Sequence, residues 1–397
     1  MLEPVKTLSI ERLKTSIMDA VDSRSQELSG LSSKIHANPE LGFKESKAAA
    51  WLVQYLEENG FSVERGICGL PTAFRGSYGE GKPSIALLAE YDALPKLGHA
   101  CGHNVIASSA VGAAVAAKLA IDRFGGNIAV IGTPAEELSG GKVIIARKGG
   151  FSGLDAAMMV HPGVADVVNT RALAAQSLEV EFFGKAAHAA DRPEMGVNAL
   201  EAIILSFNAI DALRQHIKDR ARIHGIITDG GEAANIVPAH SAATFIVRAP
   251  DDGYLNELKD RVLNCFTGAT TATGARLEYR WGETRYAPLR NNPVLTRLFR
   301  QNMEYLGRKV RPAGPNETFG STDMGNVSQL VPAIHPFVAI ASPETSIHSP
   351  EFAAAAVSDN ATRGILDAAK AMAMTVADLV TSQETVTRVR EEFEQGK

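Results

Sequence analysis

The chain has 397 residues, of which 45% are apolar and 21% are charged, as is typical of a soluble globular protein. This length exceeds what one hydrophobic core usually supports, so we expect two domains. The formal net charge of −5 argues against nucleic acid or an anionic membrane as the main partner. Three cysteines form no disulfide framework, and the charged N-terminus lacks the apolar core of a signal peptide, so we expect a cytoplasmic protein.

The first half of the chain alternates predicted helices with short apolar strands. The helices are expected at 9–35, 46–59, 108–123 and 139–148, and the strands at 85–89, 127–132 and 156–160. This alternation predicts a doubly wound, mainly parallel α/β sheet. A fourth strand at 337–341 and an amphipathic helix at 358–379 extend the same domain, and the charged tail that follows is expected to be solvated.

The segment between residues 172 and 287 follows a different pattern. Its elements have the order strand, helix, strand, strand, helix, strand, at 178–183, 196–216, 223–228, 242–247, 254–271 and 276–281. This order is that of a ferredoxin-like α+β unit. We therefore expect a catalytic domain made of residues 1–171 and 288–397, with an inserted ferredoxin-like domain at 172–287.

Thiol, imidazole and carboxylate side chains follow the predicted strands of the catalytic domain. In an α/β sheet, ligands bind outside the carboxyl ends of the strands, so these side chains should share one rim. Two metal ions with an open position for water need roughly five or six nitrogen, oxygen or sulfur ligands. Five candidates are present, namely Cys101, His103, Glu137, His161 and His348.

Each candidate also has a structural interpretation when it is considered alone. A cysteine in a Cys-Gly-His sequence is often a small buried apolar residue. The pair Glu136-Glu137 could be a solvated acidic turn, and His161 before a proline could simply end a strand. Their joint placement on one rim favours metal binding.

Seven motifs in a fixed order carry a resemblance to a known family. They are Asn38-Pro39-Glu40-Leu41-Gly42, Asp92-Ala93-Leu94-Pro95, His99-Ala100-Cys101-Gly102-His103, Pro134-Ala135-Glu136-Glu137, Gly184-Lys185-Ala186-Ala187-His188-Ala189, Asn235-Ile236-Val237-Pro238 and Gly320-Ser321-Thr322-Asp323. Together they resemble the aminoacylase/carboxypeptidase G family of dinuclear metallopeptidases along nearly the full chain. The resemblance is greatest to an amidohydrolase branch that includes aminobenzoyl-glutamate hydrolases, auxin-conjugate hydrolases and β-alanyl-lysine dipeptidases.

The resemblance implies a role for each candidate ligand. Cys101 would be a metal ligand, bridging two divalent ions, and the set His103, Glu137, His161 and His348 would complete the site. Thiolate and imidazole ligands suit Zn, Mn, Co or Ni, and the sequence does not choose among them. His99 is passed over by the family pattern, so we expect it outside the ligand set.

The resemblance also implies the catalytic and substrate-binding residues. Glu136 would be the general base that activates a metal-bound water, giving the attacking hydroxide, and then protonates the leaving amine. His188, on the inserted domain, would stabilise the tetrahedral oxyanion in the active site of the other subunit of a homodimer. Asn235 and Arg248 would hold a substrate carboxylate, a contact for which guanidinium is well suited.

Two departures from the family pattern narrow the expected function. Asn104-Val105-Ile106 stands where auxin-conjugate hydrolases have Asp-Gly-His, which makes auxin conjugates less suitable substrates. Glu90-Tyr91-Asp92 replaces a His-x-Asp signature, so Asp92 should lie behind the ligands. The expected function is hydrolysis of the amide of an N-acyl or N-aminoacyl amino acid, or of a dipeptide. The alternatives are a hydrolase of an aromatic amide or amine, and a non-catalytic metal-binding or ligand-sensing homologue.

Overall fold

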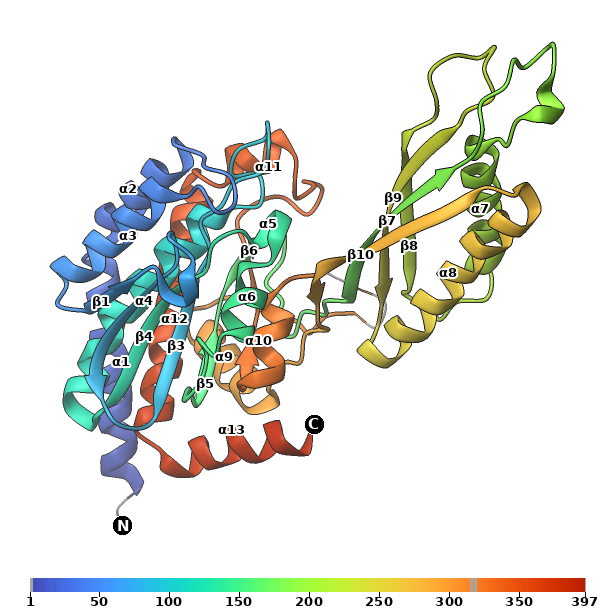
Figure 1. Ribbon diagram of the computed structural model, residues 1–397. Helices are drawn as coiled ribbons and strands as arrows, with labels where there is room; N and C mark the ends of the chain where they lie inside the picture. The colour runs from blue at the N-terminus through green and yellow to red at the C-terminus, as the bar shows by residue number, and fades with distance from the viewer. Residues whose placement is uncertain (1–2, 315–316, 318–319, 397) are drawn as a thin grey trace. The chain divides into compact units, whose positions relative to one another are not determined.

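The computed structural model describes residues 3–314, 317 and 320–396 of the chain (Figure 1). The chain divides into two compact units. Unit 1 comprises Met1–Arg171, Leu289–Glu317 and Asp323–Lys397, and unit 2 comprises Ala172–Pro288 and Thr318–Thr322. An α/β unit is thus interrupted by a smaller α+β unit, which agrees with the fold class expected from the sequence.

Unit 1 is built on a six-stranded sheet with the strand order β1-β2-β4-β3-β5-β11. Its strands are β1 (Ser62–Arg65), β2 (Phe74–Glu80), β3 (Ser84–Ala89), β4 (Gly126–Gly132), β5 (Ala156–Met158) and β11 (Ala333–Ile334). The four strands from β4 to β11 pair in parallel, and β1 and β2 add an antiparallel edge. A separate parallel pair joins β6 (His161–Gly163) to β12 (Phe337–Ala339).

Helices cover both faces of this sheet. The helices of unit 1 are α1 (Glu3–Asp22), α2 (Ser25–His36), α3 (Ser46–Glu58), α4 (His103–Phe124), α5 (Glu136–Ser139), α6 (Gly141–Arg147), α9 (Pro293–Tyr305), α10 (Met324–Leu330), α11 (Pro350–Ala355), α12 (Asp359–Val380) and α13 (Gln383–Gln395). Alternate residues of β3 enter different cores: Ile85 and Leu87 pack with α4 and α12, whereas Ala86 and Leu88 pack with α6 and α10. A strand that is buried on both faces has an uninterrupted apolar sequence, and this feature is what predicted β3 from the sequence.

Helix α4 runs through the centre of unit 1. Among the described residues it is the one helix with the length and hydropathy of a membrane span, yet 89% of its most apolar window is buried inside the protein. Alanine and glycine are frequent in its sequence, so the neighbouring helices α2 and α12 can approach it closely. The prediction that this apolar run is a buried helix is confirmed.

Unit 2 has the strand order β10-β7-β9-β8, and all three pairs are antiparallel. Its elements are β7 (Ala174–Phe183), α7 (Ala199–Arg214), β8 (Arg222–Asp229), β9 (His240–Ala249), α8 (Asp252–Thr273) and β10 (Arg276–Tyr286). Both helices lie on one face of the sheet (Figure 1), where Phe182, Phe245 and Phe266 join the core. The opposite face carries the polar residues of the alternating pattern.

Three local predictions were wrong. The predicted helix 9–35 is two helices, because the chain turns at Ser23 and Arg24. His103 was expected in a loop but is the first residue of α4. The tail expected to be solvated forms α13, whose Val386 and Phe393 are buried against unit 1. The many charged and polar residues of this tail concealed an apolar stripe at helical spacing.

Candidate metal centre

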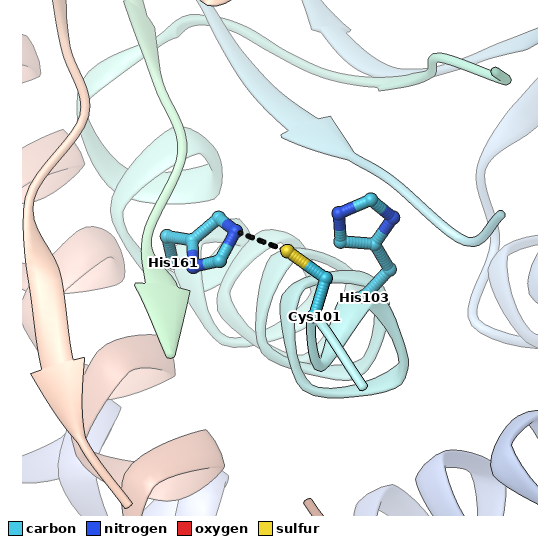
Figure 2. A group of neighbouring side chains, drawn as sticks. All are labelled: Cys101, His103 and His161. Atoms are coloured by element: carbon cyan, nitrogen blue, oxygen red, sulfur yellow. Dashed lines mark hydrogen bonds between the residues drawn. The ribbon is translucent and has the colours of Figure 1, made fainter. Parts of the chain in front are cut away.

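Cys101 and His103 lie at the start of α4, on either side of a glycine with left-handed backbone geometry. Gly102 has φ 77°, and a Cβ atom there would lie 2.6 Å from the Pro162 ring. A side chain at this position would therefore be both strained and in collision with β6. Figure 2 shows the Cys101 thiol turned toward His161, with the His103 imidazole on the other side of Cys101.

His103 is held from behind by Asp92, which follows β3. The Nδ1 atom of His103 lies 3.0 Å from Asp92 Oδ1, and both side chains are buried. Burial opposes a charge on His103, but the neighbouring Asp92 raises the pKa of the imidazole well above its usual range. Because Nδ1 is engaged by the carboxylate, Nε2 is the atom available to bind a ligand.

His161 faces Cys101 from the neighbouring strand β6. Its Nε2 lies 3.4 Å from the Cys101 sulfur, and its Nδ1 donates to the Pro162 carbonyl 2.7 Å away (Figure 2). Burial lowers the pKa of His161 to about 4, so the ring is neutral and its Nε2 lone pair faces the Cys101 sulfur. Phe337 stacks on the ring with a centroid distance of 4.6 Å and fixes its orientation.

Glu136 and Glu137 begin the short helix α5, immediately after a strained residue. Ala135 has φ 58°, an uncommon left-handed value for a residue other than glycine. Its amide donates to Glu45 Oε1 at 2.8 Å, and Thr72 donates to the other oxygen of Glu45 at 3.0 Å. Burial raises the pKa of Glu45 to about 7. Glu45, which the sequence analysis did not single out, therefore anchors the turn that aims both glutamates.

His348 closes the group from a loop before α11. It also has a left-handed backbone, with φ 67°, and its amide donates to the Ala100 carbonyl at 2.9 Å. Its Nε2 lies 3.3 Å from the Cys101 sulfur and 3.4 Å from Glu137 Oε1. Strained backbone of this kind persists where the surrounding structure holds it in place, commonly at functional sites.

The five predicted ligands converge into two overlapping groups. Cys101, His103 and His161 form one group, and Cys101, Glu137 and His348 form the other, with the ligand atoms of each within 4.8 Å of one another. Cys101 belongs to both groups. This arrangement suits two cations that share one sulfur.

The buried polar atoms of this group also fit metal ions. His103 Nε2 and Glu137 Oε1 are buried and have no hydrogen-bond partner, a costly state for such atoms. Burial raises the pKa of the Cys101 thiol well above its usual range, so a thiolate there needs a cation beside it. Sulfur, imidazole and carboxylate donors together suit Zn²⁺ and similar divalent ions.

A second layer of charge lies behind Glu136. The Lys142 ammonium is fully buried, donates to Glu90, and donates to Asp323 Oδ1 at 2.8 Å. Burial disfavours the charged lysine, but Asp323 and Glu90 outweigh it and raise the pKa of Lys142. Burial, together with repulsion from Glu90 and Asp323, raises the pKa of Glu136 well above its usual range.

Unit 2 carries the other three predicted site residues. His188 is exposed, and its Nδ1 accepts hydrogen bonds from the amides of Ala190 and Asp191 at 3.2 and 3.1 Å. Because Nδ1 accepts, the ring proton lies on Nε2, which presents a donor. The Asn235 carbonyl accepts from the next amide, at Ala189, so these two motifs adjoin within unit 2.

Arg248 lies apart from this pair, on β9. It is half-buried and donates to the Ser321 hydroxyl at 2.8 Å. It stands directly opposite Arg222 on β8, and among the described residues neither guanidinium pairs with a carboxylate. Like charges opposite each other in a sheet are unfavourable, so this pair favours an anion beside it.

Two further buried histidines border the metal group. His99 has no hydrogen-bond partner at either ring nitrogen, and burial lowers its pKa to about 3. It belongs to neither ligand group. The His335 ring lies 5.6 Å from the His161 ring, and burial lowers its pKa well below the usual range.

The sequence of this chain matches a family model over residues 86–373, and that model describes peptidase family M20/M25/M40. The match covers well over half of the chain. The chain belongs to peptidase family M20/M25/M40. It is therefore a metallopeptidase-type hydrolase that acts on amide bonds, as the ordered motifs predicted.

Curated members of this M20 family resemble the chain along most of its length. An Xaa-Arg dipeptidase of Mus musculus is 36% identical, with 97% of this chain and 93% of the mouse protein aligned. One of the subunits of the p-aminobenzoyl-glutamate hydrolase of Escherichia coli K12 is 31% identical, with 96% of this chain and 94% of the bacterial protein aligned. The family resemblance inferred from the motifs is confirmed.

Solved structures share the M20 fold. A putative aminohydrolase of methicillin-resistant Staphylococcus aureus superposes with a TM-score of 0.78 at 20% identity, covering 92% of this chain and all of that one. A dinuclear metal-binding M20 peptidase of Bacillus subtilis superposes with a TM-score of 0.70 at 19% identity, covering 91% of this chain and all of that one. At these identities the likeness concerns the fold alone.

The structure adds four residues to the predicted site of this M20 protein. Glu90 and Asp323 each stand in a motif that the sequence analysis quoted without giving them a role. Glu45 and Lys142 gave no comparable signal, because a lone charged residue in a sequence does not reveal that it is buried.

Proposed function

We propose that this M20 protein hydrolyses the amide bond of an N-acyl or N-aminoacyl amino acid, including dipeptides, and releases the free amino acid. The observation that carries the proposal is the double use of Cys101 beside Glu136 and Glu137. Two ligand groups share this sulfur, and Glu136, which neither of these two groups includes, has its carboxylate within 4.8 Å of the ligand atoms of His103 and Glu137. A non-catalytic metal-binding protein would need the ligands but not that glutamate.

In this proposal Cys101, His103, Glu137, His161 and His348 hold two divalent metal ions. When bound, the metals supply Lewis acidity that polarises the scissile carbonyl and makes water acidic near neutral pH. Asp92 and the Pro162 carbonyl keep the Nε2 atoms of His103 and His161 directed at the site. Zn, Mn, Co and Ni all suit this donor set.

Glu136 moves the proton. Its carboxylate takes a proton from the attacking water and delivers it to the nitrogen of the leaving amino acid. Burial and the neighbouring carboxylates raise the pKa of Glu136, which makes its carboxylate a stronger base. The hydrogen bond from Ala135 to Glu45 holds the turn on which Glu136 is mounted.

The residues of unit 2 would complete the reaction and select the substrate. His188 would donate from Nε2 to the oxyanion of the tetrahedral intermediate, and its Nδ1 contacts keep it in the required tautomer. Arg248 would bind the α-carboxylate of the released amino acid, and Asn235, which adjoins His188, would join it from the other subunit. The opposed guanidiniums of Arg222 and Arg248 support an anion at that position.

A substrate panel tests this function directly. The metal-reconstituted enzyme is assayed with dipeptides and N-acyl amino acids, each as the free acid and as the primary amide. Truncating one partner of a buried charge pair typically costs about 2–5 kcal/mol, so the amides should have much lower kcat/KM. Equal kcat/KM for acid and amide would remove Arg248 and Asn235 from carboxylate binding. Absence of turnover with every substrate would leave the non-catalytic alternative.

We further propose a homodimer in which each active site uses His188 of the other subunit. Strand β8 is an edge of the sheet in unit 2, and its Ile226 and Ile227 are 66% and 43% exposed. Such an edge is a ready template for pairing with a second chain. Mixed dimers of Glu136→Ala and His188→Ala subunits test the arrangement: one site per dimer then has both residues, and activity should return. Mixed dimers that form but remain inactive would contradict it.

A further inference from the structure

Glu90 is a buried carboxylate with only one of its oxygens occupied. The side chain follows β3 and is fully buried. Its Oε1 accepts a hydrogen bond from the Lys142 ammonium. Its Oε2 is also buried and has no hydrogen-bond partner. A buried carboxylate oxygen without a donor or a cation is strongly unfavourable, so this atom requires an explanation.

Lys142 does not neutralise its surroundings completely. Its Nζ donates to Glu90 and to Asp323 Oδ1, and its backbone amide donates to Asp323 Oδ2 at 2.8 Å. One ammonium therefore serves two buried carboxylates. The carboxylate oxygens of Glu90, Glu136 and Asp323 lie within 4.8 Å of one another. The Lys142 ammonium already forms ion pairs with two of these carboxylates, Glu90 and Asp323, so this group has a cation of its own. The second carboxylate oxygen, Oε2, on the other side of Glu90, receives none of these hydrogen bonds.

That side of Glu90 faces His103. Glu90 Oε2 lies 3.5 Å from His103 Nε2, which is itself buried and has no hydrogen-bond partner. The other nitrogen of His103 is engaged by Asp92, so Nε2 is the atom that would bind a metal. Ligand atoms about 2.1 Å from one Zn²⁺ ion in near-tetrahedral geometry lie roughly 3.4–3.6 Å apart. The 3.5 Å between Glu90 Oε2 and His103 Nε2 lies in this range.

We propose that Glu90 is a further metal ligand, which binds through Oε2 the cation held by His103, while Lys142 fixes its other oxygen. The ligand set of the chain then has six members, and the buried carboxylate gains a partner for each oxygen. Lys142 acts as a positioning residue that presents Oε2 to the metal. This inference rests on the proposed metal centre, but it concerns a residue to which the sequence analysis gave no role and which lies in neither of the two ligand groups.

Metal binding can be measured without turnover. The apoprotein is titrated with Zn²⁺ by calorimetry against a competing chelator, and bound metal is counted by elemental analysis after dialysis. Glu90→Gln is the principal variant, because an amide oxygen can still accept from Lys142 while the ligand charge is lost. We expect the affinity for one of two Zn²⁺ ions to fall by more than the 10–100-fold typical of groups that only orient ligands. The absorption spectrum of the Co²⁺ form should change as well.

Lys142→Met is the matched control. It removes the ammonium but keeps the Glu90 carboxylate, so both Zn²⁺ ions should remain bound, with a far smaller loss of affinity than in Glu90→Gln, although the melting temperature should fall. If Lys142→Met weakens Zn²⁺ binding as much as Glu90→Gln does, the network only positions the site and Glu90 is not a ligand. Wild-type Zn²⁺ affinity in Glu90→Gln would overturn the proposal outright.

Two further variants separate other causes of failure. The double variant Glu90→Gln/Lys142→Met removes both charges together, so it tests the loss of metal even if the single glutamine variant fails to fold. Cys101→Ala should lose at least one metal. If Cys101→Ala keeps both metals, the proposed metal centre is wrong, whatever Glu90 does. If Cys101→Ala loses metal and the folded Glu90 variants do not, only the assignment of Glu90 is wrong.

Discussion

The two units of this protein present their functional residues in opposite ways. In unit 1 the metal-facing side chains are largely buried, and most are held by a second residue: Asp92 holds His103, Pro162 and Phe337 hold His161, and Lys142 holds Glu90. In unit 2 His188 and Asn235 remain accessible, and their fixed contacts are made to nearby backbone. Buried polar groups need hydrogen-bond or charge partners within the folded protein, whereas exposed groups can bond to water until substrate binds. Substitutions in the two units should therefore fail in different ways.

The largest effect is expected from Glu136→Gln in unit 1. This variant removes the proton acceptor and leaves all five predicted ligands in place. The value of kcat should fall by roughly 10²–10⁴-fold, the usual contribution of a general acid–base. Steady-state kinetics measure the loss, and elemental analysis should find the metal content unchanged. Near-normal turnover would mean that another group is the base.

In unit 2, His188→Ala should lower kcat by about 10²–10³-fold, as expected for one lost oxyanion donor. Metal content and melting temperature should not change, because the side chain is accessible and lies outside the ligand groups. His240→Ala is the control on the same unit, where a histidine contacts Asp229 and Glu181. A His188→Ala enzyme with wild-type kcat would mean that His188 contributes nothing to the chemistry.

A smaller effect, about tenfold in kcat, is expected when Glu45 is replaced by alanine, since displacement of a catalytic group by a fraction of an ångström is costly. Ala135 would lose the acceptor that holds its left-handed turn. Glu45→Gln should retain most activity, because its amide oxygen can accept from Ala135 and the change in shape is small. Measurement of kcat and KM at constant metal content separates this effect from loss of the site. Equal losses in both variants would show that the carboxyl group itself is required.

The smallest effect concerns stability away from the site. Burial of Asp155 is outweighed by hydrogen bonds from the Ser84 amide and Lys82, which lower the pKa of the carboxyl. A carboxyl with a lower pKa in the folded state stabilises the protein above its unfolded pKa, and this contribution is lost as the pH falls through the folded pKa.

Asp155→Asn should therefore cost about 1 kcal/mol in the free energy of unfolding at neutral pH, and the difference from wild type should vanish in strong acid. Denaturant titrations at several pH values measure both. Glu181→Gln in unit 2, which alters an exposed pair with His240, should change stability by less. If Glu181→Gln lowered the free energy of unfolding more than Asp155→Asn did, the expected contrast between buried and exposed charges would be wrong.

The sequence by itself determined most of the architecture. The continuous apolar runs that became β3 and β4, and the strand and helix order of unit 2, follow from local periodicity and from burial of strands on both faces. The clustering of the five predicted ligands followed from one topological rule, because the carboxyl ends of parallel strands meet at one edge. The first two inferences use residues that are close in sequence. The third uses a topological rule that holds however far apart the strands are in sequence.

The tertiary structure alone decided which side chains support the site. Lys142 meets Asp323 from 181 positions away, and Glu45 meets Ala135 from 90 positions away. Neither pair has a period or a spacing that a local pattern could reveal. The burial of α13 was hidden for the same reason, since its apolar stripe became meaningful only against a surface formed by distant segments. Interactions between residues close in sequence specify the helices and strands. The partners of buried charges are distant in sequence, so only the folded chain brings them together.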